Sequence, residues 1–149
     1  MENVEKLKVI EEKNAEEKLN DGTPQSEFTL KMLKSAFKSG ASDIHVEAQD
    51  SGYRVRFRVL GELVVWKEVK AQVGNGVKQT IKKIALMDTS QNDIPQDGAF
   101  ELSTEENMYR LRVALSPTPQ GESVVMRVIE NTKAPTLEKL GFKNNFTSK

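Results

Sequence analysis

The 149-residue sequence predicts an α+β fold in which helices pack on a mostly antiparallel sheet. Apolar residues recur at helical spacing in two segments, and each of these is followed by three segments in which apolar and polar residues alternate. Short turn sequences join neighbouring strands, which favours hairpins over crossover connections. The length and a hydrophobic fraction of 37% suit one domain with a core of its own.

The first helix is expected to begin with Ser26 as its N-cap and to close at Gly40. Between these two residues, apolar side chains recur at helical spacing: Phe28, Met32, Leu33, Ala36 and Phe37. The preceding stretch, residues 20–25, contains a glycine and a proline. Because both residues interrupt helices, this stretch is interpreted as a linker.

The N-terminal segment is rich in charge, with six glutamates and four lysines among its first twenty residues. Val4, Leu7 and Ile10 share one helical face, which predicts a frayed helix or a helix that forms on a partner. We therefore divide the chain into a charged segment with a linker, a folded domain and a tail, at residues 1–25, 26–141 and 142–149.

Three strands should follow the first helix, at residues 43–49, 53–60 and 62–69. Leu60-Gly61 joins the last two as a tight hairpin turn. A second amphipathic helix is indicated by five apolar residues at helical spacing: Val73, Val77, Ile81, Ile84 and Ala85. We expect Lys78, Lys82 and Lys83 on this helix to face water.

The second half of the chain repeats the strand pattern. Residues 88–98 are polar and rich in turn formers, and residues 116–121 are interpreted as a loop. The expected strands and a short final helix lie at residues 100–103, 108–115, 123–129 and 137–140.

Composition narrows the function. The 22 basic and 22 acidic residues cancel, which argues against a generic nucleic-acid or membrane-surface protein. The lack of cysteine excludes disulfides, thiolate catalysis and ordinary zinc fingers. No apolar run approaches the ~20 residues of a membrane span, and the first residues do not resemble a signal peptide. We expect a cytoplasmic protein without direct membrane insertion.

Arginine is distributed unevenly: lysines are spread along the chain, but all six arginines lie in expected strands. They are Arg54, Arg56, Arg58, Arg110, Arg112 and Arg127. Because side chains alternate along a strand, the first three share one face. They form either cross-strand pairs with glutamates or a surface that binds phosphate or carboxylate. Tyr53 and Phe57 point away from them, which disfavours binding of nucleic acid.

No catalytic or metal-binding residue is predicted. His45 is the single histidine, and with no cysteine and no Gly-x-Ser-x-Gly element it is expected to have a structural role. Neither a Gly-x-x-x-x-Gly-Lys-Ser/Thr loop nor a Gly-x-Gly-x-x-Gly loop occurs among the nine glycines. The sequence therefore contains no recognisable site that hydrolyses nucleotides.

Six segments, in order, resemble the cytoplasmic assembly ATPases of type II secretion systems and type IV pili. They are Gly40-Ala-Ser-Asp-Ile-His-Val-Glu47, Arg56-Phe-Arg-Val-Leu-Gly61, Pro95-Gln-Asp-Gly98, Arg112-Val-Ala-Leu-Ser-Pro117, Gly121-Glu-Ser-Val-Val-Met-Arg127 and Leu137-Glu-Lys-Leu-Gly141. The matched part is the PAS-like domain that precedes the motor domain. Within it, the motif positions expected to be structural are Asp43, His45, Glu47, Gly61, Pro95, Gln96, Asp97, Gly98, Gly121 and Glu122.

The resemblance implies a function for the arginines. In that family the PAS-like domain contributes arginines toward a nucleotide and contacts a neighbouring subunit, while ATP and Mg are held by the separate motor domain. Arg112 is the best-matched phosphate-facing candidate, followed by Arg56, Arg58 and Arg127. No cofactor is expected in this chain itself.

The sequence also departs from the family pattern. The family usually has aspartate where Leu60 stands, arginine where Asp93 and Ala99 stand, and often an acidic residue where Arg110 stands. Two further interpretations therefore stay open beside a non-catalytic assembly domain. One is a stand-alone regulatory protein that docks on a secretion or motility complex, and the other is a sensor of an anionic nucleotide or second messenger.

Overall fold

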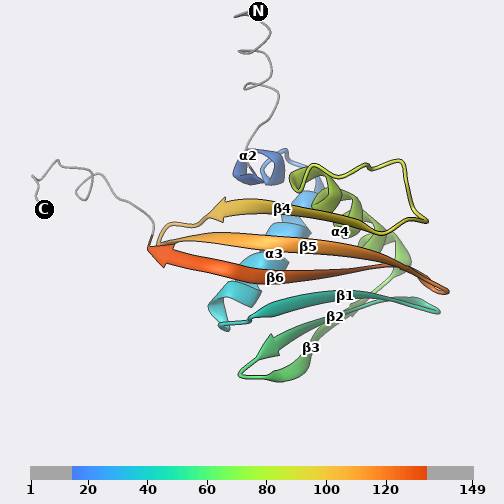
Figure 1. Ribbon diagram of the computed structural model, residues 1–149, viewed down its shortest axis with the longest axis horizontal. Coiled ribbons are helices and arrows are strands. Elements are labelled where there is room, and N and C mark those ends of the chain that lie inside the picture. Colours follow the sequence, from blue (N-terminus) through green and yellow to red (C-terminus); the bar gives the residue numbers. More distant parts are fainter. Residues whose placement is uncertain (1–14, 134–149) are drawn as a thin grey trace, which may run out of the picture.

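The computed structural model describes residues 15–133. The helices expected around Val4 and at residues 137–140 lie outside this range. Six strands form one antiparallel sheet, with helices α3 and α4 on one of its faces (Figure 1). The elements are α2 (Ala15–Leu19), α3 (Pro24–Lys38), β1 (Asp43–Gln49), β2 (Gly52–Val59), β3 (Glu62–Val69), α4 (Ala71–Ile84), β4 (Gln96–Ser103), β5 (Asn107–Thr118) and β6 (Gly121–Lys133). The predicted α+β class is confirmed.

The strands are ordered β3-β2-β1-β6-β5-β4 across the sheet. Strands β1, β2 and β3 pair in chain order, and so do β4, β5 and β6. The two halves join in the middle of the sheet, where β1 pairs with β6. Helix α4 connects β3 to β4, and so joins the two opposite edges of the sheet. No helix in the described part of the chain covers the other face, which we call the open face (Figure 1).

Helix α3 begins earlier than its apolar pattern predicts. Thr23, not Ser26, is the N-cap, and its hydroxyl accepts a hydrogen bond from the Ser26 amide at 3.2 Å. Pro24 opens the helix, because a proline in the first turn loses no helical hydrogen bond and has the right φ angle. The expected closure at Gly40 is confirmed: the helix ends at Lys38, Ser39 is its C-cap, and Gly40 follows with φ +75°.

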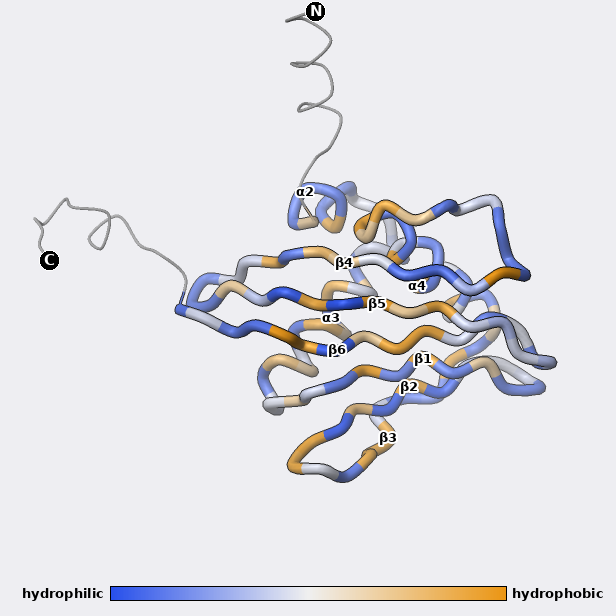
Figure 2. The backbone as a smooth tube through the Cα atoms, viewed as in Figure 1, coloured by the Kyte–Doolittle hydropathy of each residue, from blue (hydrophilic) through white to orange (hydrophobic). Residues whose placement is uncertain are grey.

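The core lies between the helices and one face of the sheet. Val55 and Phe57 are buried against the helices, while the arginines between them point to the open face, as the alternation predicts. Figure 2 shows the same alternation of hydrophobic and hydrophilic residues along β5 and β6. Leu19 of α2 is also buried in this core, so the packed unit includes residues before the expected linker.

The Leu60-Gly61 turn is confirmed, with φ angles of 52° and 84° at its two residues. The loop expected at residues 116–121 is wrong, because β5 continues to Thr118 and β6 starts at Gly121. Pro117 fits within β5 because β4 reaches only as far as Leu115, so that this end of β5 has a neighbour on one side alone. The neighbouring strands are correspondingly longer than predicted.

The expectation that three lysines of α4 face water is wrong for two of them. Lys78 and Lys82 are 7% and 0% exposed, and only Lys83 of the three is exposed. Both buried ammonium groups lie beside Glu122 of β6. A carboxylate from a distant strand therefore converts what looks like a solvated helix face into a buried ion cluster.

Candidate functional site

The arginines gather on the open face, and β-sheet register aligns them in rows. Asp43 of β1 lies between Arg58 of β2 and Arg127 of β6, and Arg127 lies directly opposite Arg112 of β5. The row thus reads Arg58, Asp43, Arg127, Arg112 across four neighbouring strands. Sequence analysis placed each arginine on a strand, but the chain crossover that brings β6 beside β1 is what puts them in one row.

The two carboxylates of β1 neutralise most of these arginines. Asp43 accepts a hydrogen bond from Arg127 Nε at 2.9 Å and lies 3.5 Å from Arg58 Nε. Glu47 accepts from Arg56 Nη2 at 2.8 Å and from Arg54 Nε at 3.3 Å. For these four arginines, cross-strand pairing with acidic residues is therefore confirmed.

The surroundings shift the pKa of both carboxylates in the same direction. Burial raises the pKa of Asp43, but the hydrogen bonds from Arg127 and Ser42 outweigh it and leave the pKa below its ordinary value. Burial likewise raises the pKa of Glu47, and Arg56 and Arg54 outweigh it. Both groups are therefore held in the ionised form.

His45 lies on the same face, between the two carboxylates of β1. Its Nδ1 is 3.8 Å from Glu47 Oε2. Burial lowers the pKa of His45, and the nearby Glu47 and Asp43 only partly offset this. A mostly neutral imidazole that lies among ion pairs is consistent with the structural role expected for His45.

Arg112 differs from the other arginines. It is exposed and forms none of the ion pairs found among residues 15–133. It lines a shallow depression of about 220 Å³, together with Asp97, Val113, Ala114, Val125 and Arg127. Two guanidinium groups directly opposite each other on neighbouring strands repel, and a bound anion would relieve that repulsion.

Arg110, two residues away on the same strand and face, has partners. Its Nε is 3.9 Å from Glu101 and its Nη1 is 4.0 Å from Glu130. The contrast marks Arg112, with Arg127 beside it, as the place on the open face where positive charge is least compensated. Arg56 and Arg58, also predicted to face phosphate, lie farther along the face and are engaged by Glu47 and Asp43.

The Pro95–Gly98 motif connects the loop before β4 to the depression. The side-chain amide of Gln96 donates to the Asp88 carbonyl at 3.0 Å and accepts from the Asp88 amide at 2.9 Å. Asp97 then points to the depression of Arg112. A Cβ atom on Gly98 would lie 2.8 Å from the Ala85 carbonyl oxygen, so that this position has no room for a side chain.

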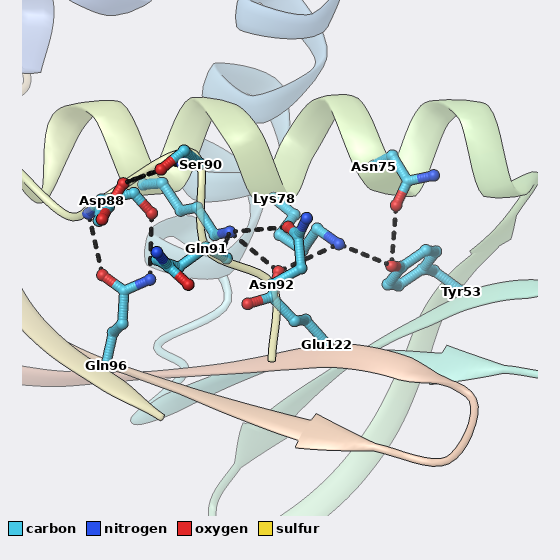
Figure 3. Close-up of polar contacts among 10 residues, drawn as sticks. Tyr53, Asn75, Lys78, Asp88, Ser90, Gln91, Asn92, Gln96 and Glu122 are labelled. Carbon is cyan, nitrogen blue, oxygen red and sulfur yellow. Dashed lines mark hydrogen bonds and ion pairs between the residues drawn. The ribbon is translucent and has the colours of Figure 1, made fainter. Parts of the chain in front are cut away.

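A second charged cluster lies inside the domain, beneath the helices. Glu122 Oε1 is 2.9 Å from Lys82 Nζ and 3.2 Å from Lys78 Nζ (Figure 3). Tyr53 links this cluster to the start of α4, since its hydroxyl lies 3.0 Å from Asn75 Oδ1 and 3.4 Å from Lys78 Nζ. The family motif includes Glu122, whereas the helical pattern predicts that both lysines face water. The available signal was that Lys78 falls on the same helical stripe as Ile81 and Ala85.

The described residues contain neither a metal-binding cluster nor a helix that could span a membrane. Within residues 15–133, no three histidine, aspartate or glutamate side chains are grouped as a metal site requires. In the same range, no helix combines the length and apolar character needed to cross a membrane. The basic groups that the open face presents at the depression are the guanidinium groups of Arg112 and Arg127.

Comparison with known families shows to which protein family the chain belongs. The family model described as Type II/IV secretion system protein matches residues 18–149. The chain belongs to this family.

Individual relatives agree. The chain is 34% identical over 107 residues to the Protein transport protein HofB homolog of Escherichia coli (strain K12). It is 33% identical over 127 residues to the type IV pilus assembly ATPase PilB of Pseudomonas aeruginosa, and 37% identical over 116 residues to the type II secretion system protein E of Xanthomonas campestris pv. campestris. These alignments cover 72%, 84% and 77% of this chain, but only 23%, 22% and 20% of the relatives.

The family pattern can now be placed on the fold. Ala99 of β4, where the resemblance predicts arginine, lies directly opposite Arg112 of β5. Asp93, the other such position, lies exposed in the loop before β4. In this family member, Arg112 therefore has alanine on one side and Arg127 on the other.

Proposed function

We propose that this chain is a non-catalytic assembly domain of a secretion or pilus ATPase, which lends Arg112 and Arg127 to a nucleotide held by a motor domain. The observation that carries the proposal is Arg112 itself, which has no ion pair among residues 15–133 and lies directly opposite a second guanidinium group, that of Arg127. A planar guanidinium group can donate two parallel hydrogen bonds to the oxygens of one phosphate. Such groups also stabilise the negative charge that builds up during phosphoryl transfer. ATP and Mg would be bound by the motor domain, and this domain would act on their charge.

The open face is the docking surface in this proposal. Its partners would be the motor domain of the same protein, a neighbouring subunit or another protein of a secretion or pilus machine, and nucleic acid is not among them. Such a protein works in the cytoplasm, next to the inner membrane through these partners. The charged residues of the open face would determine the orientation of a docked partner more than its affinity, because exposed ion pairs contribute little free energy.

The test uses the 149-residue chain and tripolyphosphate as the probe, measured by calorimetry at low and high salt. We expect weak, salt-sensitive binding that falls about tenfold in Arg112→Ala, because a charge-assisted contact is lost. Arg110→Ala is the matched control: it removes the same charge from the same strand and face, but from an arginine already engaged by glutamates. Equal losses in both variants would overturn the role of Arg112.

A second measurement separates the alternatives. No hydrolysis of ATP above buffer is expected from this chain, and measurable turnover would contradict a non-catalytic domain. Tight and selective binding of one nucleotide by the chain alone would favour the sensor. No binding of the probe at millimolar concentration would remove the phosphate-facing role and leave a docking domain.

A further inference from the structure

Lys82 makes contacts that join three parts of the domain. Its side chain is fully buried, and its ammonium group lies 2.9 Å from Glu122 Oε1 of β6. The same group donates to the Gln91 carbonyl at 2.7 Å and to Asn92 Oδ1 at 3.3 Å, both in the loop between α4 and β4. An ammonium group has three N–H donors, and Lys82 has three acceptors around it.

The loop itself is exposed. Residues 88–95 are all exposed to solvent, and Met87 just before them is half-buried. Lys82 holds the middle of the loop, at Gln91 and Asn92. Gln96 holds its start by two hydrogen bonds to the Asp88 backbone (Figure 3). An exposed loop is thus tied to a fully buried charge.

Stability alone is a poor explanation for this arrangement. Taking charges out of water is expensive, and a well-packed apolar cluster of similar volume is often at least as stable. Glu122 also remains incompletely satisfied, because neither of its oxygens accepts a well-directed hydrogen bond from residues 15–133. What the ion cluster adds over apolar packing is direction, since an ammonium group fixes where its acceptors must lie.

We propose that Lys82, held in place by Glu122, is a positioning residue that fixes the α4–β4 loop and, through it, the start of β4 at the depression of Arg112. Asp97 follows Gln96, whose side chain is hydrogen-bonded to the Asp88 backbone, and forms part of the wall of that depression. The link to anion binding rests on the proposed function, whereas the tether of the loop does not.

Lys78 supplies a matched control. It lies in the same cluster, 3.2 Å from the same oxygen of Glu122, and is also buried. Its other contact is the Tyr53 hydroxyl at 3.4 Å, at the far end of α4 from the loop. Lys78→Met and Lys82→Met therefore each remove one buried ammonium group from Glu122, but only the second releases the loop.

The experiment is hydrogen exchange of both variants, measured by mass spectrometry on the 149-residue chain and normalised to the amides of β1. We expect amides of residues 88–95 to exchange about tenfold faster in Lys82→Met, because two hydrogen bonds from a charged group are lost. In Lys78→Met these amides should keep their wild-type rate. Equal rates in the two variants, or an unchanged loop in Lys82→Met, would overturn the proposal.

Two further measurements complete the test. If Lys82→Met does not fold, Asn92→Ala removes one loop contact at an exposed residue, and we expect its loop to exchange about threefold faster; an unchanged rate counts against the tether. Tripolyphosphate affinity should fall in Lys82→Met and stay at the wild-type value in Lys78→Met. If the wild-type chain does not bind the probe, the proposed function fails, while the exchange result still decides whether Lys82 holds the loop.

Discussion

The domain contains two ion clusters built from similar parts but placed in opposite environments. On the open face, Asp43 and Glu47 each bridge two arginines whose side chains reach solvent, although Asp43 itself is buried. Inside the domain, Glu122 bridges two lysines with almost no exposure. Partly hydrated charges can lose a partner and recover water, whereas buried charges cannot. The open face can therefore vary and exchange partners, while the interior cluster is bound to the fold itself.

Removing the interior carboxylate should give the largest effect. Glu122→Ala leaves two buried ammonium groups without a counter-charge, and we expect the free energy of unfolding to fall by about 3–5 kcal/mol. Urea unfolding followed by circular dichroism measures this. Glu47→Ala, which strands two partly hydrated arginines, should cost about 1 kcal/mol or less. Comparable losses in the two variants would remove the distinction between the clusters.

The packing beside the interior cluster should tolerate little added side-chain volume at Gly74. A Cβ atom on Gly74 would lie 2.1 Å from the ring of Tyr53, which contacts Lys78 through its hydroxyl. Gly74→Ala is therefore expected to destabilise by about 1–3 kcal/mol, despite the higher helix propensity of alanine. A stabilised Gly74→Ala variant would show that Tyr53 moves freely, and thermal unfolding provides the measurement.

The two carboxylates of the open face should make the free energy of unfolding fall at acidic pH. The folded-state pKa values of Asp43 and Glu47 lie below their ordinary values of 3.8 and 4.5. Their contribution is therefore complete above about pH 4.5 and is lost as the pH falls through the folded-state values. We expect the double variant Asp43→Asn, Glu47→Gln to lose about 1 kcal/mol of the difference in stability between pH 7 and pH 3. Both proteins also carry His45→Gln, because burial lowers the pKa of His45 while Glu47 and Asp43 partly offset this, so that its titration would otherwise differ between them. Parallel pH profiles would contradict the expectation.

The smallest effect on stability is expected at Arg112. Arg112→Ala removes an exposed side chain without an ion pair among the described residues, and should change the free energy of unfolding by less than about 0.5 kcal/mol. A slight stabilisation would fit relief of repulsion from Arg127. Chemical denaturation at low salt is the measurement. A large loss would mean that Arg112 supports the fold rather than faces a ligand.

Local pattern predicted much of this molecule. Alternation along residues 53–59 assigned Phe57 to the core and Arg56 and Arg58 to the opposite face, because successive side chains on a strand point to opposite sides. The Leu60-Gly61 turn was equally local. The start of α3 was missed because Ser26 and Thr23 are both good N-caps, and only the position of Pro24 in the first turn separates them.

By itself the sequence determined the α+β class, the arginine face and, through motifs in order, the family, since each depends on residue type and near-neighbour spacing. Only the tertiary structure decided which charges meet. The pairing of β6 with β1 places Arg127 on Asp43, and the packing of α4 over β6 turns Lys78 and Lys82 inward onto Glu122. The physical reason is that a lysine on an amphipathic helix is stable facing water or facing a buried carboxylate, and the choice depends on a partner about forty residues away in the chain.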